Sequence, residues 1–186
     1  MQLPTSIACL ESNPMIAAIN DDKWTDAIES PAQVLFYLSS NILTVREKVE
    51  QAHAAGKIVM VHLDLAEGIG KDRAGIRYLS ACGADGIIST RSNLIRLAKE
   101  NELLTIQRFF TLDSKGMESI EEMLKITRPH LIEIMPGVIE KTIIRFSKSY
   151  IPVIAGGLVE TKAEVTKALA CGAAAVSTGK QELWYL

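Results

Sequence analysis

The sequence of 186 residues predicts an α/β fold, namely a compact single-domain (β/α)8 TIM barrel with short loops. Three observations support this prediction. Short apolar runs alternate with helical patterns, eight such runs occur, and no linker, charge block or low-complexity stretch interrupts them. Near-continuous apolar strands that alternate with helices indicate a parallel sheet covered on both faces. We therefore expect residues 1–186 to form one domain.

The eight predicted strands are short and evenly distributed along the chain. They are Met15–Ile19, Gln33–Leu38, Lys57–Leu63, Gly86–Ser89, Leu104–Phe110, Leu131–Met135, Pro152–Ala155 and Ala173–Ser177. Eight βα units close naturally into a barrel, although about 200–250 residues is the more usual length. The main alternative is an open doubly wound sheet, which usually has a glycine-rich loop after its first strand. Here Asn20–Lys23 follows the first run and contains no glycine, so the barrel is favoured.

Helical patterns fill most of the segments between these strands. We expect helices over Ile42–Ala55, Asp72–Cys82, Ser92–Asn101, Ser114–Thr127, Val138–Ser149 and Thr161–Cys171, and a short one over Lys180–Trp184. Apolar residues recur at helical spacing within them, as at Met117, Ile120 and Leu124. Thr161 and Glu164 have the spacing of a capping box, which predicts a helix start at that point.

Composition and charge exclude several classes of protein. The net charge is −2, so a strongly basic nucleic-acid-binding domain is excluded and any RNA contact requires a local patch. No apolar run approaches the roughly 20 residues that span a bilayer. The N-terminus does not have the pattern of a signal peptide. Three cysteines without CxxC spacing argue against a disulfide framework or a zinc site. These features predict a cytoplasmic protein that has no membrane partner.

The strongest functional signal lies where the last two predicted strands end. Gly156 and Gly157 follow the seventh run, and Ser177, Thr178 and Gly179 close the eighth. Glycines let a backbone approach a ligand closely, and the start of a following helix offers free N–H groups to an anion. Phosphate-binding barrels commonly hold their phosphate at this position. The two loops therefore predict a phosphate site, the alternative being that the glycines only form tight turns.

Ionisable residues occur at other strand ends. His62 and Asp64 alternate in the third strand, so their side chains are expected on one face. Arg108 lies within the fifth strand, where an unpaired charge would be costly, and Asp64 or Glu133 is available as its partner. Arg91 is a candidate clamp for a phosphate or carboxylate, or else a solvated surface arginine.

The sequence offers few residues that could carry out catalysis. A metal site needs further His or carboxylate ligands, but His53 and His130 precede strands and so lie at the opposite end of a barrel. We therefore expect neither a metal nor a cofactor. We find no lysine and no cysteine at the carboxyl end of a predicted strand, so a covalent nucleophile is missing. Only His62, Asp64 and Glu133 remain for acid–base work. This favours a binding protein over an enzyme, although the fold alone does not decide between them.

Six segments carry a resemblance to a known family. They are VHLDLAEGI (61–69), GIISTRS (86–92), IQRFFTLDS (106–114), PHLIEIMPG (129–137), IPVIAGGL (151–158) and GAAAVSTGKQELW (172–184). Because of the order and spacing of these segments, the chain resembles the glycerol uptake operon antiterminator regulatory proteins, which respond to glycerol 3-phosphate. The resemblance implies a small TIM barrel that binds this ligand and acts on the leader mRNA of glycerol-utilisation operons, where it prevents premature termination.

The resemblance also suggests how the ligand would be held. Its phosphate would lie on Gly156, Gly157, Thr178 and Gly179, with Ser177 beside them. Its hydroxyls would face Asp64, Glu133 and either Gln107 or Arg108. A ligand with one anionic group and two hydroxyls needs no nucleophile and no cofactor, which agrees with the sparse inventory. The alternative function is that of an isomerase or lyase acting on a small phosphorylated substrate.

The RNA-binding surface and the oligomeric state stay open. Two groups of basic residues are available, Arg91, Arg96 and Lys99 in one and Lys71, Arg73 and Arg77 in the other, and an ordinary solvated face is the simpler interpretation of each. One hypothesis is that the ligand orders the loop Ala66–Arg73 and thereby shapes a basic face. Trp184 and Tyr185 are available either to cover the barrel or to contact a second copy in a homo-oligomer.

Overall fold

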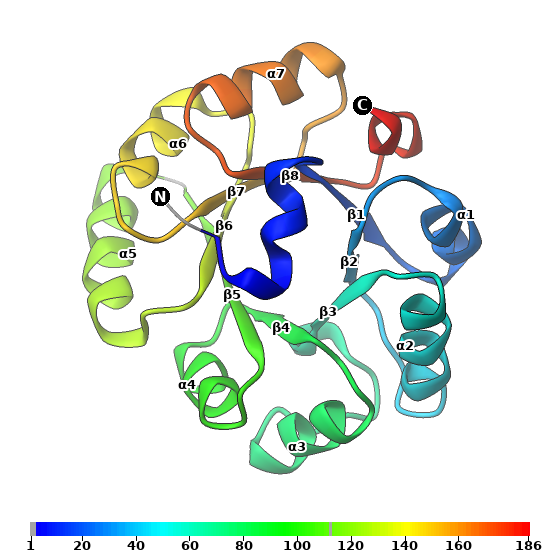
Figure 1. The fold of residues 1–186 in the computed structure, drawn as a ribbon. Helices are drawn as coiled ribbons and strands as arrows, with labels where there is room; N and C mark the ends of the chain where they lie inside the picture. The colour runs from blue at the N-terminus through cyan, green and yellow to red at the C-terminus, as the bar shows by residue number, and fades with distance from the viewer. Residues whose placement is uncertain (1–2, 112) are drawn as a thin grey trace.

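A computed structural model, which describes residues 3–111 and 113–186, contains a closed barrel of eight parallel strands (Figure 1). The strands are β1 Met15–Ile19, β2 Val34–Tyr37, β3 Ile58–His62, β4 Gly86–Ser89, β5 Leu104–Phe110, β6 Leu131–Met135, β7 Val153–Gly156 and β8 Ala175–Thr178. Each strand pairs with the next in sequence, and β8 closes the ring against β1. The predicted TIM-barrel fold is therefore confirmed.

Seven α-helices of the described residues surround the barrel. They are α1 Trp24–Glu29, α2 Val45–Ala54, α3 Arg73–Ala81, α4 Ser92–Glu100, α5 Ser114–Thr127, α6 Glu140–Ser147 and α7 Lys162–Ala170. The sequence patterns did not predict α1, which is a helix of only six residues. The predicted capping box of Thr161 and Glu164 is present at the start of α7. The expected short helix after β8 is a 3-10 helix, η4, over Gln181–Tyr185.

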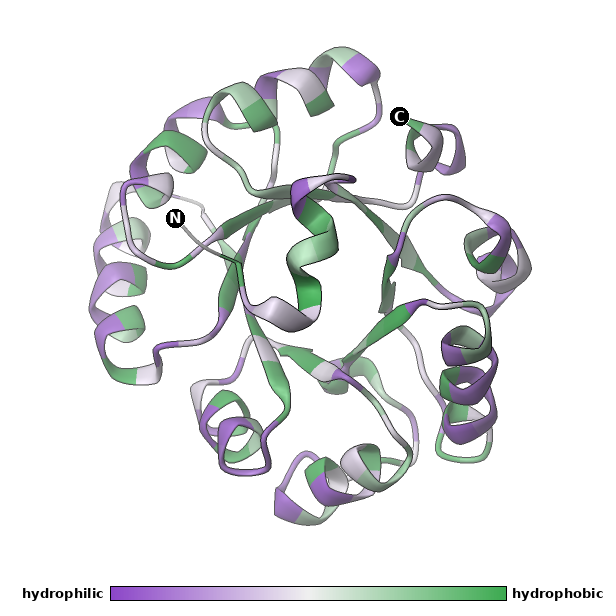
Figure 2. Cartoon of the chain, in the orientation of Figure 1, coloured by the Kyte–Doolittle hydropathy of each residue, from purple (hydrophilic) through white to green (hydrophobic). Residues whose placement is uncertain are grey.

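A further 3-10 helix, η1 (Thr5–Glu11), precedes β1 and closes the amino end of the barrel. In Figures 1 and 2 it lies across the centre of the ring, with apolar residues along much of its length. Ile7 and Leu10 are buried against residues that line the barrel interior, among them Ile16 and Phe36. Because η1 fills this end, the barrel interior is accessible from the opposite end.

The barrel interior changes from apolar to polar along the strands. Met60, Ile106 and Leu131 belong to the apolar interior cluster near the amino ends. Two residues further along the same strands, the inward positions are occupied by His62, Arg108 and Glu133, because side chains alternate between the two faces of a strand. Polar groups therefore gather at the carboxyl ends. Among the helices of the described residues, none has both the length and the apolar character needed to cross a membrane.

Candidate functional site

A cavity of about 330 Å³ opens at the carboxyl ends of the strands. Its lining comes from the ends of β1, β2, β5 and β6 and from the loops after β7 and β8. Six residues that the sequence singled out are part of this lining: Arg108, Glu133, Gly157, Ser177, Thr178 and Gly179. The two loops for which a shared phosphate site was predicted therefore meet at one cavity.

Hydrogen bonds tie these two loops together. Thr178 Oγ1 donates to the carbonyl of Val159 at 2.7 Å and accepts from the amide of Lys180 at 3.1 Å. The indole of the buried Trp184 donates to the Thr178 carbonyl at 2.8 Å, so η4 packs beneath the β8 loop. Of the two roles open to Trp184, the structure thus gives it that of covering the barrel. The Thr178 hydroxyl is therefore engaged by the protein itself.

The loop after β7 has an unusual backbone. Gly157 and Leu158 both have positive φ, +73° and +60°. Residues other than glycine rarely adopt this backbone conformation. A β-carbon at Gly157 would lie 2.6 Å from Met135 Cε. Leu158 holds this conformation with 68% of its surface exposed, so burial of its side chain does not account for the geometry. Such residues cluster at ligand sites, and this loop lines the cavity.

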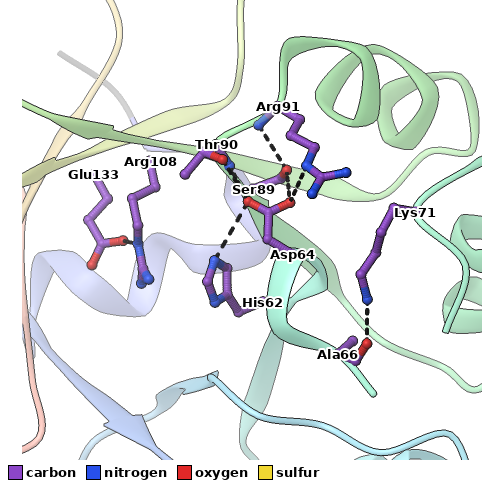
Figure 3. A network of polar contacts seen from close by, with 9 residues as sticks. All are labelled: His62, Asp64, Ala66, Lys71, Ser89, Thr90, Arg91, Arg108 and Glu133. Carbon is purple, nitrogen blue, oxygen red and sulfur yellow. Dashed lines mark hydrogen bonds and ion pairs between the residues drawn. The ribbon is translucent and has the colours of Figure 1, made fainter. Parts of the chain in front are cut away.

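One wall of the cavity is a buried ion pair. Arg108 Nε and Glu133 Oε2 are 2.5 Å apart, on positions that pair directly between β5 and β6 (Figure 3). Ser177 Oγ donates to the other carboxylate oxygen of Glu133 at 2.6 Å. Glu133 is 1% exposed, so both of its oxygens have a donor in the interior. Of the two partners proposed for Arg108, the structure selects Glu133.

Gly156 has a different place from the one predicted for it. It is not part of the cavity lining, because it lies behind the carboxylate of Glu133. A β-carbon there would collide with Glu133 Oε1 and would lie 2.6 Å from Ser177 Oγ. The glycine is required at this point so that the carboxylate of Glu133 can lie against the β7 backbone.

Two lysines at the mouth were missed in the sequence. Lys23 and Lys180 both line the cavity, so the inference that no lysine lies at the carboxyl end of a strand is wrong. Lys23 ends the 3-10 turn η2 (Asp21–Lys23) after β1, and its Nζ donates to the carbonyl of Gly179 at 2.7 Å. Lys180 Nζ lies 3.9 Å from Glu160 Oε1. The adjacency of Lys180 to Gly179 in the sequence was a signal that could have identified it.

A second polar cluster lies across the mouth, outside the lining of this cavity. Asp64, in the 3-10 turn η3 (Leu63–Leu65), accepts from Ser89 Oγ and from the amide and hydroxyl of Thr90 at 2.7–2.8 Å (Figure 3). Burial alone would raise the pKa of Asp64, but the hydrogen bonds from Thr90 and Ser89 lower it below its usual value. Arg91 Nε lies 3.8 Å from Asp64 Oδ1, with its side chain 55% exposed. Asp64 therefore fastens the loop after β4.

His62 lies between the two clusters and has no hydrogen-bond partner among the described residues. Its Nε2 is 3.8 Å from Asp64 Oδ2, beyond hydrogen-bonding distance. Burial and the positive charge of Arg108 lower the pKa of His62 to about 4, so the ring is neutral at pH 7. As the sequence indicated, His62 and Asp64 are close to each other, but they do not form an acid–base couple.

Gln107 is placed outside the barrel, which contradicts its predicted role at the ligand. Its Nε2 donates to Ser92 Oγ at 3.1 Å and contacts Met123, so the side chain points toward α4 and α5. The reason is strand geometry, because Arg108 points inward and its neighbour must then point outward. Of the pair Gln107 and Arg108, only Arg108 reaches the cavity.

Lys71 fastens the loop for which ligand-dependent ordering was suggested. Its Nζ donates to the carbonyl of Ala66 (Figure 3) and to that of Ile69, both within the same loop. Arg73 forms an ion pair with Glu100 at 2.9 Å. The loop is therefore held by its own contacts, and ordering by a ligand stays a prediction.

Comparison with known proteins identifies the family. The family model described as "Glycerol-3-phosphate responsive antiterminator" matches residues 15–184, nearly the whole barrel. The chain belongs to the glycerol-3-phosphate responsive antiterminator family. The resemblance noted in the sequence is thus confirmed. An uncharacterized Escherichia coli protein, YgcP, is 34% identical over 180 residues, which cover 95% of this chain and 94% of that protein.

Solved structures of antiterminator proteins share this barrel. The glycerol uptake operon antiterminator regulatory protein of Listeria monocytogenes has 35% identity and a TM-score of 0.89, covering 99% of this chain and 98% of that one. An antiterminator-related protein of Thermotoga maritima has 32% identity and a TM-score of 0.83, covering 91% and 96%. A deoxyribose phosphate aldolase of Aeropyrum pernix, at 12% identity and a TM-score of 0.72 over 93% and 88%, shares the fold alone.

Proposed function

We propose that this antiterminator-family protein binds glycerol 3-phosphate in the barrel mouth. In that state it acts in the cytoplasm on the leader mRNA of glycerol-utilisation operons and prevents premature termination. The observation that carries the proposal is the convergence of the β7 loop, the β8 loop and Lys23 on one cavity. Family membership supports the nature of the ligand and of the regulated transcript.

The charges of the cavity favour a small anion. Arg108 and Glu133 neutralise each other, and Lys180 lies near Glu160. Lys23 has only a carbonyl as its partner and, across residues 3–111 and 113–186, forms no ion pair. A phosphate in the cavity would therefore meet one uncompensated ammonium beside two backbone turns. Charge-assisted hydrogen bonds of this kind are about twice as strong as neutral ones.

We further propose that the protein is a regulator and not an isomerase or lyase. The groups that would carry acid–base catalysis are engaged by the protein itself. Glu133 is held by Arg108 and Ser177, Asp64 accepts three hydrogen bonds, and His62 is absent from the cavity lining. NMR of triose phosphates incubated with the protein should show no conversion. Turnover that disappears in Glu133→Gln would favour the enzyme instead.

Calorimetric titration with glycerol 3-phosphate tests the ligand half of the proposal. Gly157→Asp puts bulk and negative charge into the β7 loop and should abolish measurable binding. Gly56→Asp is the matched control, because Gly56 also has positive φ (+71°) but has open space around it and lies outside the cavity lining. Lys23→Gln should weaken binding by about tenfold to a hundredfold, since a hydrogen bond to a charged group contributes about 1.5–3 kcal/mol.

Glycerol and inorganic phosphate, titrated separately, show which part of the ligand dominates. We expect phosphate to compete and glycerol alone to bind weakly, because the cavity offers one ammonium and two backbone turns to an anion. Wild-type affinity in Gly157→Asp, together with unchanged affinity in Lys23→Gln, would exclude this cavity as the ligand site.

The RNA half is tested by fluorescence anisotropy with a labelled leader RNA from a glycerol-utilisation operon. Affinity should rise when glycerol 3-phosphate is added, and by thermodynamic linkage the RNA should raise affinity for the ligand by the same factor. Equal RNA affinity with and without ligand would contradict a ligand-responsive regulator.

A further inference from the structure

A second hollow, of about 510 Å³, lies at the amino end of the barrel, where β6 and β7 begin. Its lining consists of Leu3, Pro4, Thr5, Arg128, Pro129, His130, Tyr150, Ile151 and Pro152. We call it the amino-end groove. No carboxylate is among these lining residues, whereas the ligand mouth includes Glu133 and Glu160. The groove therefore differs from the mouth, since the one side chain of its lining that is charged at pH 7 is the guanidinium of Arg128.

Basic residues occur at the C-terminal ends of α4, α5 and α6, and one of them, Arg128, belongs to the groove lining. Lys99, in the last turn of α4, donates from Nζ to the carbonyl of Arg128. Arg128, which follows α5 with a φ of +43°, donates from Nε to the carbonyl of Lys125. Lys148 follows α6, two residues before Tyr150. Because cations stabilise the C-terminus of any helix, their charge alone does not define a binding site.

The second observation is the chemistry of the groove surface. Tyr150 is 72% exposed, so most of its aromatic ring is accessible to a molecule in the groove. His130 belongs to the same lining and is oriented by β5. The amide of Thr105 donates to His130 Nδ1 at 3.1 Å, so in the neutral ring the proton is on Nε2. Burial and the charge of Lys99 lower the pKa of His130, which keeps the ring neutral at pH 7.

Together these side chains offer an aromatic face, a ring N–H donor and a guanidinium within one groove. Unpaired nucleotides are bound by this combination: bases stack on aromatic rings, their edges accept or donate hydrogen bonds, and phosphates pair with arginine. We propose that the amino-end groove binds an unpaired segment of RNA, with a base on Tyr150 and the backbone phosphate on Arg128. This inference rests on the proposed function, which requires an RNA partner, and it assigns that partner to the end opposite the ligand.

The two ends of the barrel are joined by the same two strands. β5 and β6 hold Arg108 and Glu133 at the mouth, and near their starts Thr105 contacts His130 beside the groove. A ligand that contacts Arg108 therefore acts on the strands that orient His130. Strands β5 and β6 therefore connect the ligand mouth with the RNA groove, although ligand and RNA would not contact each other.

The test uses the labelled leader RNA and the full chain, in the presence of glycerol 3-phosphate. Tyr150→Ala should weaken RNA binding about tenfold, since stacking on an aromatic ring contributes about 1–3 kcal/mol per base. Arg128→Gln should weaken it at low salt and reduce the slope of log affinity against log salt by about one. Both side chains are exposed, so calorimetric affinity for glycerol 3-phosphate should equal that of the wild type in both variants.

Matched controls are Tyr185→Ala, another exposed tyrosine, and Arg46→Gln, an exposed arginine on α2 that, like Arg128, donates to a backbone carbonyl. Both should bind the RNA as the wild type does. Photo-crosslinking of the RNA should label the peptide that contains Tyr150. Normal RNA binding in Tyr150→Ala and Arg128→Gln, or crosslinks confined to the mouth, would overturn the groove assignment while leaving the regulator intact. A wild-type protein that binds glycerol 3-phosphate but no RNA would instead overturn the proposed function, and this inference with it.

Discussion

Two polar clusters share the barrel mouth and differ in how completely their groups are paired (Figure 3). In the Glu133 cluster, formed by Arg108, Glu133 and Ser177, both carboxylate oxygens have donors and the charges cancel. In the Asp64 cluster, formed by Asp64, Ser89, Thr90 and Arg91, both carboxylate oxygens also have donors, but the nearby His62 has no hydrogen-bond partner within residues 3–111 and 113–186.

The difference separates two roles for buried polar groups. The Glu133 cluster is neutral before any ligand arrives, so it forms a rigid wall and contributes little net charge to the cavity. The Asp64 cluster instead fixes the loop after β4 through backbone and hydroxyl donors. If this distinction is correct, perturbing the first cluster should destabilise the fold much more than perturbing the second.

The largest effect is expected for Glu133→Ala. It leaves the buried guanidinium of Arg108 without a partner, and removing one member of a buried ion pair costs about 3–5 kcal/mol. Urea denaturation at pH 7.5 measures the change in the free energy of unfolding. The double variant Arg108→Met with Glu133→Met is the control, because replacing both charges by apolar groups is often close to neutral. A double variant less stable than Glu133→Ala would show that the unpaired charge is not the cause.

Gly156→Ala should be the next most damaging change. The added β-carbon collides with Glu133 Oε1 and approaches Ser177 Oγ, so the ion pair must shift, and such overpacking costs about 1–3 kcal/mol. Gly116→Ala, in the first turn of α5, is the matched control, because among the described residues outside its own helix backbone its β-carbon would approach only Asp113 Oδ1, at 3.3 Å. Thermal denaturation should show a clear drop for the first variant and little change for the second. Equal stability of both would mean that the carboxylate of Glu133 is not held against Gly156.

The fold could be predicted because it depends on repeated patterns. Apolar runs separated by helical patterns identify a parallel barrel without knowledge of any single contact. α1 was missed because a six-residue helix is too short to show a periodic pattern. The site was harder to predict for a geometric reason. β5 has polar residues at two consecutive positions, Gln107 and Arg108, and a strand buried on both faces does not indicate which one points inward.

Lys23 illustrates a second limit of the sequence. It contacts Gly179, which is 156 positions away in the chain, and only closure of the barrel brings β1 beside β8. Gly156 was identified correctly as a special glycine but was given the wrong reason. A glycine signals a close approach, and the sequence does not reveal whether a ligand or, as here, the carboxylate of Glu133 makes that approach.

The unpaired His62 predicts a loss of stability in acid. Its pKa is about 4 in the folded protein and about 6.5 in an unfolded chain, so between these values the unfolded state binds more protons. Stability is therefore complete above pH 6.5 and falls as the pH decreases toward 4, by about 2 kcal/mol between pH 7.5 and 5.0. Urea denaturation at these two pH values, compared with His62→Leu, isolates the effect because His53 and His130 are common to both proteins. An equal loss in the variant would mean that another group is responsible.

The smallest effects are expected at the Asp64 cluster, and they distinguish its hydrogen bonds from its charge. Asp64→Asn keeps the shape but replaces one acceptor by a donor that faces Ser89 or Thr90, at a cost of about 1–2 kcal/mol. Arg91→Gln removes only an exposed ion pair at 3.8 Å, which should contribute less than about 0.5 kcal/mol. Chemical denaturation of both variants at low and high salt measures the two contributions. A larger loss in Arg91→Gln, reduced by salt, would show that charge fixes the β4 loop instead of hydrogen bonding. The Asp64 and Glu133 clusters would then both be held by charge, and they would differ only in how far their ion pairs are exposed to solvent.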